Sequence, residues 1–373
     1  MSTRMDKYHS TDKRPTNRNT KPRPRPSSNG ARRPNPKKRR RKKKNPTARI
    51  ILLSLALLFL LGLGGGAYYV VNLLGKVNTE KINKANLGVD DDLNARLKSL
   101  GKDNIINIAL FGLDKTNEEE RGRSDATMVL SIDADNKKIR LISLMRDSYV
   151  SIDGHGKDKL NHAHAFGGPE LAIKTINKNF NLNITDFVSV DFAHMQKVID
   201  ALGGVEIDVK PEEVKIANQY VVELAKLGRT DPDYIDKAGK QTLSGMQALS
   251  YTRIRYVGNG DFERTDRQRR VLEALFDKIK NAGPTEFPKI VSELLPMVTT
   301  SLSSTDIMKL GSDLLLKGVT NLEQERFPVD GDYVDGGKTI NGVWYLPFDE
   351  KATKDKLHKY IFEDIKPSIT TSN

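Results

Sequence analysis

The sequence contains no cysteine among its 373 residues. Disulfide scaffolds, thiol nucleophiles, cysteine-ligated zinc and iron–sulfur clusters are therefore excluded. Three signature motifs are also missing: the Walker phosphate-binding loop, the Gly-x-Ser-x-Gly nucleophile elbow and the complete Gly-x-Gly-x-x-Gly fingerprint. Their absence argues against nucleotide-binding and serine-hydrolase functions.

Charge is distributed unevenly along the chain. The 61 Lys and Arg residues exceed the 48 Asp and Glu residues, which gives a formal net charge of +13. Residues 1–49 hold 19 of the basic residues and two acidic ones, a net +17, so residues 50–373 carry −4. With 37% hydrophobic residues in the chain, the later part can bury a sizeable core.

The first 74 residues predict a tail and a membrane anchor. Residues 1–49 are rich in proline and small polar residues, which is typical of a disordered segment. Residues 50–74 are uncharged, and as a helix they would be about 37 Å long, enough to cross a hydrocarbon core of about 30 Å. This stretch is too long for a cleaved signal peptide, which favours a retained signal-anchor. The positive-inside rule places the tail in the cytoplasm and the residues after about Gly75 outside.

The basic run at residues 37–44 has two interpretations. Eight adjacent cations could bind nucleic acid phosphates, but orientation of the span and attraction to anionic membrane lipids already account for them. We therefore expect membrane lipids as partners and do not expect nucleic acid. Gly62 and Gly66 have the spacing that allows two membrane helices to pack closely, yet the sequence leaves the oligomeric state open.

The remainder of the chain predicts a layered α/β/α domain with a central mixed β-sheet. Residues 75–103 suggest an extracytoplasmic stalk or short helix, residues 104–365 one large domain, and residues 366–373 a C-terminal tail. Strand-like and helical patterns alternate, which is typical of helices covering a sheet. We expect strands at 105–111, 127–132, 139–144, 186–191, 205–209 and 325–329, and helices at 170–180, 193–201, 261–280, 287–297, 304–316 and 351–362.

Several arginines occur at the ends of expected strands. In an extended segment Arg121, Arg123 and Asp125 would share one side, because side chains alternate with period two. The same rule would place Arg253 and Arg255 on one side of residues 251–256, opposite Ile254. Both groups could then converge on a cleft.

A further basic group opens the expected helix 261–280. Arg264, Arg267 and Gln268 fall on the face that continues with apolar residues, whereas Arg269 and Arg270 fall on the other side. Unpaired charges are costly to bury, so this face suggests a bound anion. The alternative is surface pairing of the arginines with Asp261, Glu263 and Asp266.

Together with Arg146 and Lys159, these arginines would suit a pyrophosphate, because the guanidinium fork matches phosphate oxygens. Asp114 and Asp125 could supply oxygen ligands to magnesium, or to manganese, beside the phosphates. A structural role in hydrogen bonding is the alternative for these two acids. His155, His162 and His164 lie in a Gly-rich stretch that reads as a loop, so zinc is not expected.

These residues, in this order, resemble the LytR-CpsA-Psr family of Gram-positive cell-envelope proteins. The resemblance extends from about Asn104 to Leu272, nearly half the chain, and an N-terminal span is usual in the family. The matching stretches are Gly112-Leu113-Asp114, Arg123-Ser124-Asp125, Ser143-Leu144-Met145-Arg146-Asp147, Asp158-Lys159-Leu160-Asn161, Gly203-Gly204-Val205, Gln247 to Arg255, and Gly260-Asp261-Phe262 with Arg264, Arg267 and Gln268.

The resemblance implies an extracytoplasmic phosphotransferase. Such an enzyme moves an anionic glycopolymer, of the wall teichoic acid or capsular polysaccharide type, from undecaprenyl pyrophosphate to peptidoglycan, at the 6-hydroxyl of N-acetylmuramic acid. Catalysis would then rest on Arg146, Asp125 and Arg255, with Asp125 as the first candidate for a base. The resemblance further implies that Asp114 and Asp125 are associated with magnesium. It also implies that the pyrophosphate contacts Arg123, Arg146, Arg253, Arg255, Arg264 and Gln268, together with Lys159 and Arg267. We add Arg121 to this set from its spacing.

One position departs from the family pattern, because Met145 stands where a proline usually precedes the Arg-Asp pair. Two other functions stay open at this point. The protein could be a transcriptional regulator or attenuator acting through its cytoplasmic tail, or a non-catalytic binder of polyprenyl-linked glycans. The sequence does not identify the glycopolymer, the role of residues 284–373, or the residues of the prenyl groove, whose lining would look like ordinary core.

Overall fold

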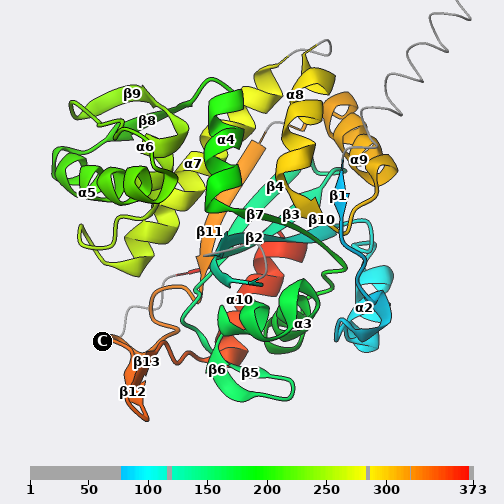
Figure 1. Ribbon diagram of the computed structural model, residues 1–373. Helices are drawn as coiled ribbons and strands as arrows, with labels where there is room; N and C mark the ends of the chain where they lie inside the picture. The colour runs from blue at the N-terminus through cyan, green and yellow to red at the C-terminus, as the bar shows by residue number, and fades with distance from the viewer. Residues whose placement is uncertain (1–76, 116–119, 283–285, 320, 369–373) are drawn as a thin grey trace, which may run out of the picture. The chain divides into compact units, whose positions relative to one another are not determined.

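The computed structural model describes residues 77–115, 120–282, 286–319 and 321–368 (Figure 1). The expected basic tail and membrane span lie outside these ranges. In the described ranges, every helix is too short or too polar to traverse a bilayer. All described residues fall within one compact unit, Leu61–Asn373.

A seven-stranded sheet forms the centre of the fold, in the order β1-β10-β7-β2-β3-β4-β11 (Figure 1). Strands β2, β3 and β4 are consecutive antiparallel neighbours, whereas β7 pairs parallel with β2 and β11 pairs parallel with β4. The sheet is therefore mixed, as predicted. Its strands are β1 (Asn78–Thr79), β2 (Ile106–Asp114), β3 (Arg123–Asp133), β4 (Lys138–Leu144), β7 (Asp186–Asp191), β10 (Thr299–Thr300) and β11 (Asn321–Phe327).

Side-chain alternation gives the sheet two different apolar faces. Ala109, Phe111 and Leu113 of β2 belong to the main core, which they share with helices α2 (Asp91–Ser99), α3 (His162–Phe180) and α10 (Glu350–Phe362). Leu110 and Gly112, one residue out of step, face the opposite side, toward α4 (Phe192–Ala201) and α7 (Asp261–Asn281). Helices on both faces make the predicted α/β/α layering.

A second apolar core lies beside the sheet. It joins α7 to α5 (Pro211–Gly228), α6 (Gly245–Thr252) and the hairpin of β8 (Val205–Val209) and β9 (Gly239–Leu243). Two further hairpins pair β5 (Tyr149–Ile152) with β6 (Gly156–Lys159) and β12 (Lys338–Ile340) with β13 (Val343–Tyr345). The other elements are η1 (Lys84–Asn86), α8 (Phe287–Leu294), η2 (Leu295–Met297) and α9 (Ser304–Leu316).

The segment expected to be a stalk is part of the packed fold in its described residues. Leu87, Leu93 and Leu97 are buried in the main core, and β1 pairs with β10 at the edge of the sheet. Three buried leucines supply enough apolar surface for this segment to pack. The packed domain therefore begins before residue 104.

Two local expectations were wrong. Residues 251–256 are not an extended segment, because α6 runs through Gly245–Thr252. Ser244 caps this helix, and Gln247 completes the capping box by accepting a hydrogen bond from the Ser244 backbone N–H. Likewise, the stretch holding His162 and His164 is not a loop but the first turn of α3, which is kinked at Gly167 and Gly168.

Candidate functional site

The site begins at a β-bulge in β3. Ser124 pairs with Leu113 and Ala126 pairs with Gly112, so Asp125 is the additional residue between them. A side chain at Gly112 would be crowded, since a Cβ there would come within 3.0 Å of the Ala126 Cβ. The bulge interrupts the period of two, so the simple alternation that would put Asp125 on the side of Arg123 does not hold through this point.

Three arginines from separate elements converge on Asp125. Arg146, which follows β4, donates from Nη1 to Asp125 Oδ1 at 2.8 Å. Arg264, in the first turn of α7, donates from Nη2 to the Asp125 carbonyl at 2.8 Å and to Oδ2 at 3.3 Å. Arg255, which follows α6, reaches Oδ2 at 3.3 Å. The structure thus brings together four of the residues that the sequence singled out.

Asp261 is a second carboxylate of this cluster and was not among the predicted site residues. It accepts hydrogen bonds from Arg264 Nη1 at 2.9 Å and from Arg146 Nε at 3.2 Å. Its spacing of three residues from Arg264 on a helix was a usable signal. We call Asp125, Arg146, Arg255, Asp261 and Arg264 the arginine cluster.

Asp147 and Lys159 extend the arginine cluster on one side. Asp147 Oδ2 lies 3.4 Å from Arg146 Nε, and its Oδ1 lies 2.7 Å from Lys159 Nζ. Lys159 therefore reaches the cluster through Asp147 instead of contacting Asp125 directly. Asp147, like Asp261, was missed, although it follows Arg146 in the chain.

The charges of the cluster determine which of its side chains are ionised. Burial raises the pKa of the Asp125 carboxyl, but the charges of Arg264 and Arg146 outweigh it and hold this pKa below its ordinary value of 3.8. The pKa of Asp261 is lowered in the same way, against burial, by Arg264 and Arg146. For Arg146, burial opposes the charged form, but Asp261, Asp125 and Asp147 together raise the pKa. Three carboxylates therefore face four cations when Lys159 is included, which leaves a positive surplus for an anion.

An apolar cavity lies next to the cluster, between the sheet and helices α4 and α7, with about 1370 Å³ of atom-free space when the open solvent at its mouth is included. Ala126, the neighbour of Asp125, and Gln268, one turn after Arg264, both line it. The Oε1 atom of Gln268 is buried without a hydrogen-bond partner among the described residues. One hydrogen-bond acceptor is therefore available where the arginine cluster meets the cavity. The remaining walls are almost entirely apolar: Leu110, Met128, Leu130, Val190, Met195, Ile199, Val271, Leu272 and Leu275 are among them.

Two predicted site arginines have structural partners elsewhere. Arg267 is 1% exposed and donates to Glu213 Oε1 at 2.8 Å and to the carbonyls of Ile254 and Val257. Arg253 stacks on the rings of Phe192 and Tyr220, at 5.5 and 5.3 Å from their centroids. Arg253 and Arg255 do not share a side, because α6 ends between Thr252 and Arg253 and the alternation of an extended chain does not apply.

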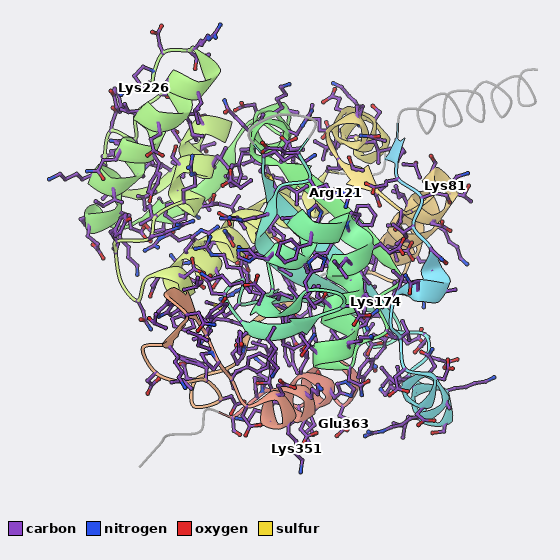
Figure 2. The ribbon with its side chains drawn as sticks, turned by 60° about the horizontal axis from the view of Figure 1, so that its bottom comes forward. Lys81, Arg121, Lys174, Lys226, Lys351 and Glu363 are labelled. Carbon is purple, nitrogen blue, oxygen red and sulfur yellow. The ribbon has the colours of Figure 1, made fainter. Side chains whose placement is uncertain are left out.

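Arg121, Arg123 and Asp114 lie at the open end of the β2–β3 pair. Arg123 and Asp114 are exposed and stand opposite each other in the register, and neither side chain has a hydrogen bond or ion pair to the described residues. Arg121 lies beside α3 and donates to the Phe166 carbonyl at 3.2 Å (Figure 2). It lines a separate polar cavity of about 880 Å³. Two departures from an extended chain explain why these arginines do not join Asp125 as the alternation predicted: the bulge at Asp125 separates it from Arg123, and Arg121 lies before β3, beyond Gly122 with a φ of 70°.

Arg269 departs from the expected faces of α7. The sequence placed it on the outer side of the helix, yet its side chain is buried. Its Nη1 donates to Ser143 Oγ on β4 at 3.0 Å, and its Nη2 donates to Asp266 Oδ1 at 3.3 Å. The helix is therefore enclosed on more than one side near its start.

The three histidines do not converge on a common point. His162 Nδ1 lies 2.9 Å from Asp158 Oδ2, and His164 Nδ1 lies 3.1 Å from the Gly122 carbonyl, while His155 stacks on Phe166. Burial lowers the pKa of His164 to about 4, so this ring is neutral near pH 7. Each histidine therefore has a local structural partner.

The acidic residues fit magnesium better than zinc. Asp114 offers an exposed carboxylate at the end of β2, and Asp125 lies on the neighbouring strand. Mg²⁺ is usually held by one or two carboxylates together with substrate phosphates, so these two acids match the donor chemistry. In the described ranges no group of three or more His, Cys, Asp or Glu could hold a metal by itself.

The LytR_cpsA_psr family model matches residues 69–360. The chain belongs to this family. It is 35% identical over 213 residues to the polyisoprenyl-teichoic acid–peptidoglycan teichoic acid transferase TagU of Enterococcus faecalis, covering 56% of this chain and 65% of that relative. It is 31% identical over 274 residues to the regulatory protein MsrR of Staphylococcus aureus, covering 73% of this chain and 78% of that relative.

A solved structure of a family member holds a ligand. It is YwtF (TagT) with bound octaprenyl pyrophosphate lipid, which aligns with a TM-score of 0.50 and 25% identity over 69% of this chain and 90% of that one. The ligand combines a prenyl chain with a pyrophosphate.

Proposed function

We propose that this protein is a membrane-anchored transferase that attaches an anionic glycopolymer, carried on undecaprenyl pyrophosphate, to peptidoglycan outside the membrane. One observation carries the proposal: β3 and α7 each contribute residues both to the arginine cluster and to the wall of the apolar cavity. β3 supplies Asp125 and Ala126, and α7 supplies Arg264 and Gln268. A pyrophosphate on the cluster would place an attached prenyl chain at the mouth of the cavity.

The chemistry of the two parts matches the two parts of such a donor. Guanidinium groups bind phosphate oxygens in a bidentate manner, and an apolar wall lowers the free energy of a buried prenyl chain. The relative from E. faecalis, named as a teichoic acid transferase, and the octaprenyl pyrophosphate in the solved family structure support this assignment. Wall teichoic acid is therefore the favoured glycopolymer, with capsular polysaccharide as the other candidate.

In this mechanism Arg146, Arg255 and Arg264 neutralise the pyrophosphate, and a sugar hydroxyl of the acceptor attacks the phosphorus that carries the glycan. A new P–O bond to the acceptor forms, the bridging P–O bond of the pyrophosphate breaks, polyprenyl monophosphate leaves, and the hydroxyl proton is released to solvent. Catalysis consists mainly of positioning and charge stabilisation. Asp125 and Asp261 hold the arginines in place. The lowered pKa of Asp125 makes it a weak proton acceptor, so we assign it to this positioning role in preference to that of a general base.

Asp114 and Asp125 would hold a magnesium ion, which supplies charge neutralisation at the leaving phosphate when it is bound. The cluster alone has a surplus of one positive charge, while a pyrophosphate esterified at both ends keeps a negative charge on each phosphate. An additional cation at Asp114 would balance the difference.

The membrane anchor is part of the proposal and rests on the sequence of residues 50–74. An anchor with the tail in the cytoplasm would hold the described domain outside, at the surface where a prenyl-linked donor resides.

The test uses the full chain in detergent with a synthetic polyprenyl-pyrophosphoryl glycan and soluble peptidoglycan strands. We expect release of polyprenyl monophosphate together with transfer of the glycan, and a loss of both when the divalent cation is chelated. Donor binding with neither product would favour the non-catalytic binder and contradict the transferase.

A regulatory role is the second candidate, since the S. aureus relative is named a regulatory protein. A chain lacking residues 1–44 separates the two functions. The transferase predicts little loss of activity in the assay above, whereas a regulator acting through the tail predicts loss of its cellular effect.

A further inference from the structure

Trp344 is the single tryptophan of the chain, and it is 41% exposed on the β12–β13 hairpin. Its Nε1 donates to the Gly336 carbonyl at 2.9 Å. The indole packs on Gly337, where a Cβ would lie 2.6 Å from Nε1 and so has no room. The ring is therefore fixed by its own hairpin, although much of it is left exposed.

The hairpin is connected to the arginine cluster through Lys159. Lys159 Nζ lies 5.7 Å from the centroid of the Trp344 ring, within cation–π distance, and 2.7 Å from Asp147 Oδ1. Asp147 in turn contacts Arg146. The backbone supports the same connection, because the Leu346 N–H donates to the Asp147 carbonyl at 2.9 Å.

The hairpin does not take part in the wall of the apolar cavity. The cavity is bounded by α4, α7 and the sheet, and among the described residues no lining residue follows Leu322 or falls between residues 142 and 187. Neither Trp344 nor Lys159 lines the cavity. In phosphoryl transfer the attacking and leaving oxygens are roughly in line, so the acceptor approaches from the side away from the prenyl phosphate.

We propose that the exposed face of Trp344, with Lys159 beside it, binds a pyranose ring of the peptidoglycan acceptor. The proposal rests on the transferase function above and names the acceptor side of the same site. A fixed aromatic face stacks on the C–H face of a sugar, and the lysine can donate to hydroxyl or carboxylate oxygens of the strand. The donor glycan is the other possible source of such a ring.

The test exploits the single tryptophan, whose emission in the full chain reports on this position alone. Soluble uncrosslinked peptidoglycan strands should change the emission saturably without any donor present, and the soluble donor glycan should not. No change with peptidoglycan, or a change with the donor glycan only, would overturn the proposal. A saturable change in a protein that shows no transfer would retain the acceptor site and reject the transferase function.

Kinetic measurements on variants of the hairpin provide a second test of the acceptor site. Trp344→Ala should raise the KM for peptidoglycan about 10-fold or more while donor binding stays unchanged, and Trp344→Phe should recover part of the loss. Val343→Ala is the matched control, since Val343 is equally exposed on the same strand. An unchanged KM in Trp344→Ala, or an equal effect in Val343→Ala, would contradict the assignment.

Discussion

Arg264 and Arg267 lie three residues apart on α7 and are almost equally buried, with side chains 2% and 1% exposed. Arg267 donates to Glu213 and to two backbone carbonyls in an enclosed layer. Arg264 lies between Asp125 and Asp261, next to Arg146 and the half-exposed Arg255. Burial of an arginine therefore does not by itself indicate a binding site.

The difference between the two positions is one of charge balance and access. Glu213 neutralises Arg267, Glu263 Oε2 lies a further 4.0 Å from its Nη2, and the carbonyls of Ile254 and Val257 accept from its other donors. In the cluster, cations outnumber carboxylates and Arg255 is open to solvent. An incoming anion can be bound there without breaking a closed pair.

The largest expected effect is on folding, at Arg267. Arg267→Ala would leave the fully buried Glu213 carboxylate without its partner, which should cost about 3–5 kcal/mol in the free energy of unfolding. Urea unfolding measures this loss. The double variant Arg267→Met with Glu213→Leu should recover much of the lost stability. If Arg267→Ala instead lost transfer per folded molecule without losing stability, the structural role of Arg267 would be contradicted.

The next effect is on transfer, at Arg255. Arg255→Ala should lower the transfer rate about 10²- to 10³-fold, as does removal of one charge-stabilising donor in other enzymes, and leave unfolding nearly unchanged. Arg270→Ala is the matched control, because Arg270 pairs with Asp266 on α7 away from the cluster. Equal transfer rates for Arg255→Ala and Arg270→Ala would contradict the distinction between an arginine of the cluster and an arginine elsewhere on α7. Arg146 is a less clean test, since it contacts three carboxylates and its loss should also destabilise the fold.

A smaller effect should follow from narrowing the cavity. Val190→Trp adds volume to a residue of the cavity wall, so the KM for a long-chain prenyl donor should rise about 10-fold. A donor with a short prenyl chain should be affected less. The same rise for both donors would mean that the chain does not enter this cavity.

The smallest effect is the pH dependence of stability. Because the pKa values of Asp125 and Asp261 are lowered in the folded state, the unfolded chain takes up protons first as the pH falls. Their contribution is present above the ordinary pKa of 3.8 and is lost as the pH falls through the lower folded values. Asp125→Asn should therefore show a shallower loss of thermal stability below about pH 4, and an unchanged slope would argue against the lowered pKa.

Several strands could be predicted from sequence because their residues alternate or form apolar runs. The strands at 186–191 and 205–209 were predicted with their bounds, and the helix expected at 261–280 ends one residue later. Helix α6 was not among the expected helices, although Ser244 and Gln247 form a capping box that could have indicated where it starts.

The site was predicted in part. The structure brings Asp125, Arg146, Arg255 and Arg264 together, and their roles toward a substrate stay predictions. The pairing of Arg267 with Glu213 spans 54 residues and leaves no local pattern. The bulge at Asp125 depends on pairing with β2, so it too could not be predicted from the local sequence. Assignments of Asp114 to magnesium and of Arg121 and Arg123 to the substrate stay predictions.

The most direct measurement of the central claim is calorimetric titration of the full chain in detergent with a polyprenyl pyrophosphate and with the corresponding prenol. We expect much tighter binding of the pyrophosphate. In Arg255→Ala we expect a loss of affinity of about 10- to 100-fold for the pyrophosphate alone, since hydrogen bonds to charged groups contribute roughly 1.5–3 kcal/mol. Equal affinities of the wild-type protein for the two lipids would contradict the central claim.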